Sequence, residues 1–177
     1  MYGAGASKLA EFLQVNTAQA NGIINSFIGR FPALRSFFNS VMNVCRQKGE
    51  LRTFSGRRRL FPAINSPIPY LRSQAERQAI NFLIQGTAAD VCKAAMLRTE
   101  LQLSRRPDIE AYLLLQIHDE LLWEVRDLHL QQVEELVRAA MEDSTSLFSG
   151  TPSMTIPLPV IITTGKSWAR MSSNDAV

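Results

Sequence analysis

The stretch that decides the fold is LQIHDELLWE, residues 115–124. Two apolar runs, 112–117 and 121–125, lie on either side of its His-Asp-Glu triplet. Apolar runs of this length, bounded by polar residues, are typical of consecutive strands in a buried sheet. We therefore expect a β-hairpin whose tight bend carries His118, Asp119 and Glu120 at the rim of the sheet.

Asp119 and Glu120 would place two carboxylates side by side on that bend, which is costly unless a cation neutralises them. Hard oxygen ligands of this kind suit Mg²⁺, which takes one or two carboxylates and leaves other positions for a substrate phosphate. The triplet thus indicates metal-assisted phosphoryl or nucleotidyl transfer. A solvated acidic turn is the alternative, and the triplet alone does not separate the two.

The length and composition bound the class of protein. With 177 residues the chain can form one ordinary domain or two small subdomains around a real core. It has no run of 18 or more apolar residues, so we expect no membrane span, and its start has no secretory pattern. Cys45 and Cys92 do not make a disulfide framework and are expected to be buried thiols in a reducing compartment.

The net charge of +3 is unevenly distributed. Between Arg46 and Arg77 eight basic residues stand against two acidic ones, so this segment carries +6 and the remainder carries −3. A basic middle beside an acidic hairpin suggests a polyanion held near a metal. An ordinary solvated basic face is the alternative.

Turn and helix signals predict the order of elements. The first half reads as helices with Pro32 in a first turn and Gly49 as a C-terminal cap, followed by a short hairpin and a proline-rich loop. The loop is the best boundary between two segments, 1–68 and 69–177. The expected elements are helices at 7–15, 17–30, 32–49, 71–103 and 128–141, a hairpin at 51–61, the strands 112–117 and 121–125, and a β-rich run at 158–164.

The long helix carries a row of hydrogen-bond donors. Arg77, Asn81 and Gln85 stand at i, i+4 and i+8, so they share one face. The minor groove of DNA presents acceptors at every base pair, so such a row suits contact with a duplex without reading its sequence. The alternative is the solvent face of an amphipathic helix.

Two further features of this region bear on packing and binding. Gly86 costs helix stability relative to alanine, which predicts close approach by another backbone or a ligand. The turn residues Arg57, Arg58 and Arg59 carry guanidiniums that match phosphate oxygens. A separate apolar stripe is expected to face the core, with the members Ile80, Ile84, Ala88, Val91 and Ala95.

Together these segments resemble the C-terminal part of a family A DNA polymerase. They occur in the family's order and at about its spacing, and the resemblance covers nearly the whole chain. The opening MYGAG and the run 76–82 are most similar to the eukaryotic theta/nu branch, with the nu members first. The matching segments are Tyr2-Gly3, 56–59, 75–81, 85–90 and 116–121.

The resemblance implies an α+β fold that is a partial right-hand polymerase. Residues 1–68 would be the helical end of the fingers with a short basic hairpin, and 69–177 a partial palm with a small antiparallel sheet. It also implies Mg²⁺ as cofactor, primer–template DNA and, in the complete enzyme, a deoxynucleoside triphosphate as partners. Nuclear location and a role in repair or translesion synthesis rest on the resemblance alone.

The resemblance also assigns roles to single residues. Asp119 would be one of two catalytic aspartates that hold the metal ions, Glu120 would support it, and His118 would lie near the primer end. Tyr2 would pack near the templating base. Arg77, Asn81 and Gln85 would line the minor groove, and Arg57, Arg58 and Arg59 would contact the nucleic-acid backbone.

Some motifs of the family have no match in this sequence, and this leaves three interpretations of the chain. Nothing in these residues matches the family's other catalytic aspartate or the helix that grips the triphosphate, so we expect no polymerisation by this chain alone. The chain could be a piece of a complete polymerase, a short product that binds primer–template DNA without catalysis, or a fragment with no independent role. Salt-dependent DNA affinity would favour the short DNA-binding product. Poor solubility would favour a fragment with no independent role.

Overall fold

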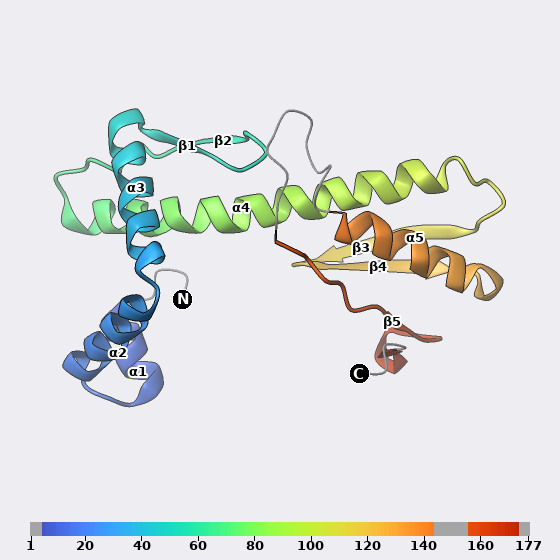
Figure 1. Cartoon of the computed structure of the whole chain (residues 1–177), viewed down its shortest axis with the longest axis horizontal. Helices are drawn as coiled ribbons and strands as arrows, with labels where there is room; N and C mark the ends of the chain where they lie inside the picture. Colours follow the sequence, from blue (N-terminus) through green and yellow to red (C-terminus); the bar gives the residue numbers. More distant parts are fainter. Residues whose placement is uncertain (1–4, 144–155, 174–177) are drawn as a thin grey trace. The chain divides into compact units, whose positions relative to one another are not determined.

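The computed structural model describes residues 5–143 and 156–173, in which helices are joined to three two-stranded antiparallel sheets (Figure 1). This is the α+β composition that the sequence predicts. The helices are α1 (Ala6–Leu13), α2 (Thr17–Arg30), α3 (Pro32–Lys48), α4 (Pro69–Leu103) and α5 (Leu130–Glu142), with short 3-10 turns at Asp127–His129 and Trp168–Arg170. The strands are β1 (Glu50–Arg52), β2 (Arg58–Leu60), β3 (Ala111–Ile117), β4 (Glu120–Val125), β5 (Thr163–Thr164) and β6 (Ser172–Ser173).

The chain divides into two compact units, residues 1–87 and 88–177, and the division falls inside α4. The predicted boundary between 68 and 69 concerns fingers and palm and stays a prediction. Within the described residues, every helix is too short or too polar to cross a lipid bilayer.

The helices α2 and α3 begin and end where local signals predict, whereas α1 ends at Leu13, two residues before the predicted Val15. At the start of α2, the Asn16 side chain accepts from the Gln19 N–H at 2.8 Å while the Gln19 side chain accepts from the Asn16 N–H at 3.1 Å. This capping box satisfies donors that a helix otherwise leaves unpaired. Pro32 opens α3, and Gly49 ends it with φ +68°, a conformation that glycine adopts without strain.

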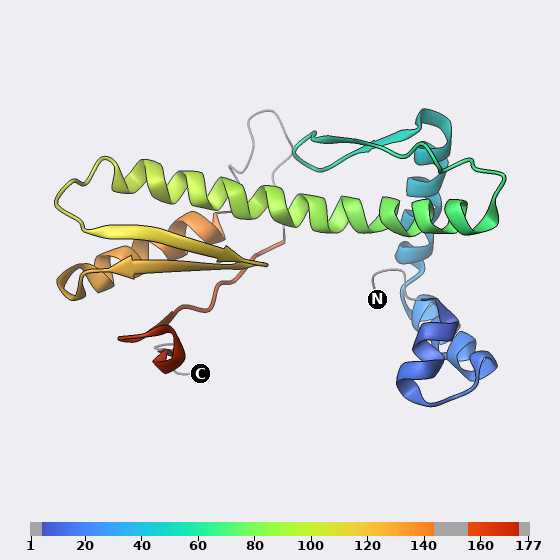
Figure 2. The same cartoon turned by 180° about the vertical axis from the view of Figure 1, so that it is seen from behind.

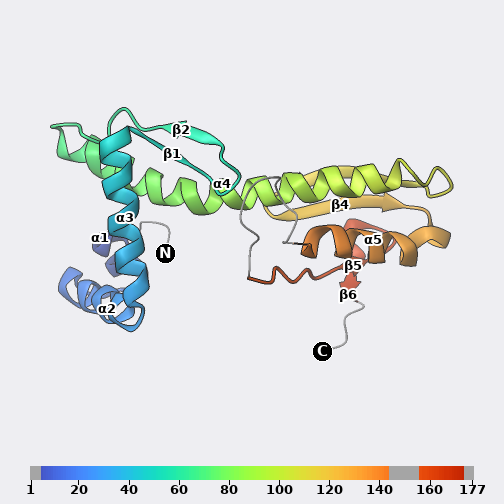
Figure 3. The same ribbon diagram turned by 45° about the horizontal axis from the view of Figure 1, so that its top comes forward.

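The core of the first unit lies between α3, the β1–β2 hairpin and the N-terminal part of α4. Figure 3 shows the hairpin running alongside this part of α4. Phe61 and Phe82 meet edge to face with ring centroids 5.9 Å apart, a favourable aromatic arrangement. The buried members of this core are Val41, Cys45, Leu51, Phe61, Ile64, Ala75, Ala79 and Phe82.

The predicted apolar stripe of α4 is confirmed only in part. Ile80 packs against the first core and Ala95 is buried, but two other members are not. Ile84 is 44% exposed and Ala88 is also exposed, whereas Ala79, Phe82 and Gly86 are buried. The face of α4 that meets the first core contains Ala75, Ala79, Phe82 and Gly86. The hairpin comes close at Gly86, and the Phe82 ring packs on Phe61, so Ile84 is left outside this face.

The second unit is built on the β3–β4 hairpin, which Figure 2 shows beside α5 and the C-terminal turns of α4. The strands pair from Ala111 opposite Val125 to Ile117 opposite Glu120, with an irregularity between Leu113 and Leu115. One face of the hairpin packs on the second core, whose buried members are Leu103, Ile109, Val133 and Val137, with Ala111, Trp123 and Val125 against them.

Two expectations about the strands need correction. The sheet is not buried on both faces, because Tyr112 and Leu114 are 62% and 50% exposed. In the described residues only one face of the two-stranded sheet has a core to pack against. The β-rich run at 158–164 forms strand only at Thr163–Thr164, which pairs with Ser172–Ser173.

Candidate active site and nucleic-acid interface

The His-Asp-Glu triplet occupies the bend between β3 and β4, as the sequence predicts. Ile117 pairs with Glu120, so His118 and Asp119 form a two-residue turn. His118 has φ +55°, a left-handed conformation that non-glycine residues rarely adopt and that such hairpin turns require. The Gln116 side chain donates from Nε2 to the His118 carbonyl oxygen at 3.3 Å and so braces the turn.

All three residues of the triplet are exposed, so the turn presents its polar groups to solvent. Burial raises the pKa of the Cys92 thiol on α4, and the nearby Asp119 carboxylate raises it further. Cys92 and Cys45 are both free and buried, as expected.

The carboxylate oxygens at the turn suit Mg²⁺ as ligands, but they do not make up a complete metal site by themselves. Asp119 and Glu120 are hard oxygen ligands, and Mg²⁺ commonly uses one or two carboxylates together with phosphate and water. No group of three or more His, Cys, Asp or Glu side chains able to hold a metal occurs among residues 5–143 and 156–173. Among the described residues, the turn thus offers at most two carboxylates to a metal.

The donor row of α4 is present on the helix but is not uniform. Arg77 is exposed and donates from Nη1 to the Ser73 hydroxyl at 2.8 Å, and Gln85 is exposed. Asn81 is half-buried, and its side-chain oxygen is buried without a hydrogen-bond partner among the described residues. Because buried polar atoms are normally paired, this unpaired acceptor is a distinctive feature of the row.

The three arginines of the basic turn lie in different surroundings. Arg57 donates from Nη2 to the Gly86 carbonyl oxygen at 2.9 Å. The guanidinium of Arg59 lies over the rings of Phe61 and Phe82, with centroid distances of 5.1 and 5.7 Å. Arg58, by contrast, is exposed and pairs with Glu50.

Gly86 shows the close approach that the sequence predicts. A Cβ atom at this position would lie 2.8 Å from Cγ2 of Thr53 and 3.2 Å from the Phe82 ring. The next residue, Thr87, accepts the Phe54 N–H on its hydroxyl oxygen at 3.2 Å. The tip of the β1–β2 hairpin is therefore docked on α4 through Gly86 and its neighbours.

Tyr2, a predicted site residue, lies outside the described residues. Arg52 was missed by the sequence analysis, although it lies directly opposite Arg58 in the hairpin and shares the carboxylate of Glu50 with it. Side chains alternate between two faces along each strand. The sequence could therefore have indicated that Arg52 and Arg58 share one face of the hairpin.

Comparison with known proteins matches this chain to one family. The model of DNA polymerase family A matches residues 1–170. DNA polymerase theta of Drosophila melanogaster is 34% identical over 174 residues, which covers 95% of this chain and 8% of the fly protein. DNA polymerase I of Lactococcus lactis is 36% identical over 168 residues, which covers 95% of this chain and 18% of the bacterial protein.

The solved structures agree with the sequence comparison. The POL domain of Pol1 from M. smegmatis, in complex with DNA primer-template and dNTP, is similar with a TM-score of 0.75 and 37% sequence identity. The match covers 80% of this chain and 25% of that chain. It confirms the expected fold, a partial polymerase of helices and small antiparallel sheets. The chain spans less than a fifth of the length of the two relatives given above.

Proposed function

This chain belongs to DNA polymerase family A, and we propose that it forms part of a DNA-directed DNA polymerase. In that enzyme it would hold primer–template DNA and supply one half of a two-metal site for nucleotidyl transfer. The observation that carries the proposal is the braced turn in which Gln116 and the left-handed His118 present Asp119 to solvent. A preorganised turn of this kind can place a ligand accurately at low entropic cost.

Asp119 would hold the catalytic Mg²⁺, with Glu120 supporting it from the first position of β4. When bound, the ion would neutralise charge that develops on the phosphate during transfer. His118, on the same turn, would lie near the primer end. The deoxynucleoside triphosphate would supply further oxygen ligands in the complete enzyme.

The DNA itself would be contacted by the first unit. Arg77 and Gln85 are exposed donors on α4, and the unpaired Asn81 lies between them in the row. The solved relative whose complex contains primer-template DNA supports DNA as the partner. Tyr2 would pack near the templating base.

We propose the branch of the family to which this chain belongs from sequence similarity. The opening MYGAG and the run 76–82 favour the theta/nu branch and, within it, DNA polymerase nu. A role in DNA repair or translesion synthesis and a nuclear location would follow from that branch. The match to the fly polymerase theta is consistent with the branch.

We also propose that the 177-residue chain does not polymerise alone. A two-carboxylate site without further acidic ligands leaves part of the phosphate charge unneutralised. The alternative function is a short, non-catalytic product that binds primer–template DNA, which the excess of basic residues between 46 and 77 favours. A primer-extension assay with the isolated chain is expected to give no product, while its DNA affinity falls as salt is raised. Absence of DNA binding at low salt would sink the alternative.

The direct test of the catalytic role uses a complete polymerase that contains this segment. Asp119→Ala is expected to lower the rate of primer extension by about a thousandfold or more, because the loss of a metal ligand removes several kcal/mol of charge stabilisation. Glu124→Ala, an exposed acidic residue on the same hairpin, is the matched control and should leave the rate within about twofold. Retained extension by Asp119→Ala would overturn the assignment.

A further inference from the structure

The β1–β2 hairpin separates its basic residues onto two faces. Its register places Glu50 opposite Leu60, Leu51 opposite Arg59, and Arg52 opposite Arg58. Because neighbouring residues of a strand point to opposite faces and directly paired residues share a face, Glu50, Arg52 and Arg58 lie together. Leu51 and Arg59 lie on the other face.

The inner face is used for packing. Leu51 is buried, and Arg59 lies over two aromatic rings of the core. Arg57 belongs to the same side, since its guanidinium binds the Gly86 carbonyl and lies 5.6 Å from the centroid of the Phe82 ring. These two arginines attach the hairpin to α4.

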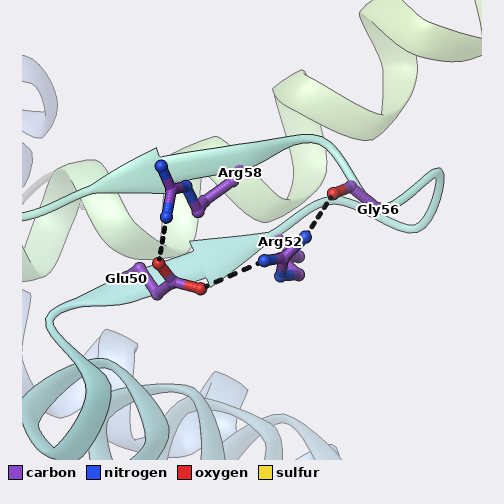
Figure 4. A network of polar contacts seen from close by, with 4 residues as sticks. All are labelled: Glu50, Arg52, Gly56 and Arg58. Carbon is purple, nitrogen blue, oxygen red and sulfur yellow. Dashed lines mark hydrogen bonds and ion pairs between the residues drawn. The ribbon is translucent and has the colours of Figure 1, made fainter.

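The outer face holds a preformed pair of guanidiniums on one carboxylate (Figure 4). Arg52 Nη2 lies 3.5 Å from Glu50 Oε1, and Arg58 Nη1 lies 3.3 Å from Glu50 Oε2. Arg52 also donates from Nη1 to the Gly56 carbonyl oxygen at 3.3 Å, which directs its side chain along the hairpin. The two arginine side chains are 60% and 57% exposed, and that of Glu50 is 22% exposed.

The Glu50 carboxylate shows that the two guanidiniums can hold one anion between them. Each of its two oxygens binds a different guanidinium, as two oxygens of a phosphodiester could. Arginine binds phosphate strongly because its planar fork matches the oxygens. An exposed ion pair contributes little stability, so its exchange for a phosphate costs little.

We propose that Arg52 and Arg58 form a subsite for a backbone phosphate of primer–template DNA, and that Glu50 is its internal counter-ion, displaced when the phosphate binds. The inference rests on the proposed function, since it takes DNA as the ligand. It divides the arginine triplet, because only Arg58 would contact the backbone directly from this face. It also gives Glu50 a tuning role, because the carboxylate competes with DNA for the same guanidiniums.

The test is the affinity of the 177-residue chain for a fluorescent primer–template duplex, measured by anisotropy over a range of salt concentrations. Glu50→Gln is expected to tighten binding at low salt by about threefold to tenfold, because the competing carboxylate is gone. Arg52→Gln and Arg58→Gln are each expected to weaken binding, and each should reduce the slope of log affinity against log salt by about 0.9.

Matched controls separate the subsite from net charge. Glu11→Gln on α1 changes the charge as Glu50→Gln does, and Arg35→Gln on α3 does so for the two arginine variants; both residues are exposed. If the effects at positions 50, 52 and 58 equal those of the controls, the subsite does not exist. The tightening by Glu50→Gln should also vanish when Arg52 and Arg58 are both replaced, and its persistence would contradict the mechanism.

The outcomes also distinguish this inference from the proposed function. No binding of the duplex by the unaltered chain at low salt would overturn both. Binding that is normal in strength but indifferent to these three positions would overturn only the subsite. Thermal melting followed by circular dichroism confirms that each variant is folded, and all these side chains are exposed enough to be replaced without disturbing the core.

Discussion

A glycine stands at position 86 in the interior of α4, where alanine has the higher helix propensity. At this position the close packing of the hairpin, and not helix propensity, accounts for the residue. A methyl group there would meet Cγ2 of Thr53 at 2.8 Å, closer than carbon atoms pack, and the Phe82 ring at 3.2 Å. The docking of the hairpin on α4 therefore depends on the absence of this single methyl group.

Gly86→Ala is expected to lower the free energy of unfolding by about 1–2 kcal/mol, because overpacking outweighs the gain in helix propensity. Urea denaturation of the whole chain measures the effect. Gly22→Ala in α2 is the matched control, since nothing lies within 4 Å of its added methyl group, and it should stabilise by about 0.5–1 kcal/mol.

The cause of the loss can be checked with a second substitution. Thr53→Ser removes Cγ2 but keeps the hydroxyl that accepts the Arg57 N–H. In that background Gly86→Ala should cost less than in the parent chain. An equal cost in both backgrounds would place the clash elsewhere.

At the scale of elements, α5 is fixed to its neighbours through its C-terminal end. Arg98 on α4 donates from Nη1 to the carbonyl oxygens of Ala140 at 3.3 Å and Asp143 at 2.7 Å. These carbonyls belong to the last turn of the helix and the residue after it, where a cation is favoured. Arg138 donates to the Val160 carbonyl at 2.9 Å, so α5 in turn holds the segment that follows.

Arg98→Met is expected to lower the free energy of unfolding by about 2 kcal/mol, because its charged hydrogen bonds are lost and helix carbonyls lose their partner. Arg106→Met is the control, since Arg106 pairs with Asp108 at the surface and should cost less than about 0.5 kcal/mol. Equal losses in the two variants would show that the end of α5 is not held in this way.

At the scale of the whole molecule, the two buried thiols link stability to alkaline pH. Burial raises the pKa of Cys45, with Arg46 opposing, and burial followed by the Asp119 charge raises that of Cys92, both from an ordinary value of 9.0. The unfolded chain therefore loses these protons at lower pH than the folded one. The stabilisation is complete below about pH 9 and is lost as pH rises through the folded pKa values.

We expect the free energy of unfolding to fall more steeply between about pH 8 and about pH 11 in the parent chain than in a Cys45→Ala/Cys92→Ala variant. The difference in slope is at most about 1.4 kcal/mol per pH unit for each thiol. Denaturation curves at several pH values measure it. Parallel pH profiles would show that the thiols do not contribute.

Local signals in the sequence determined where most elements begin and end. Pro32 and Gly49 bound α3 as predicted, because one is suited to a first helical turn and the other to a left-handed cap. The His-Asp-Glu bend was equally readable, because two apolar runs separated by a polar triplet leave little choice but a hairpin. These features depend on residues close together in the chain.

Only the tertiary structure decided which side of each element is buried. Ile84 was expected in the core and is exposed, because α4 packs through the face that contains Ala79, Phe82 and Gly86. Likewise, three consecutive arginines look equivalent in the sequence, yet Arg58 alone turns outward to Glu50. Strand alternation separates Arg58 from Arg57 and Arg59 but does not say which face is buried. The physical reason is that burial depends on contacts between segments far apart in the chain.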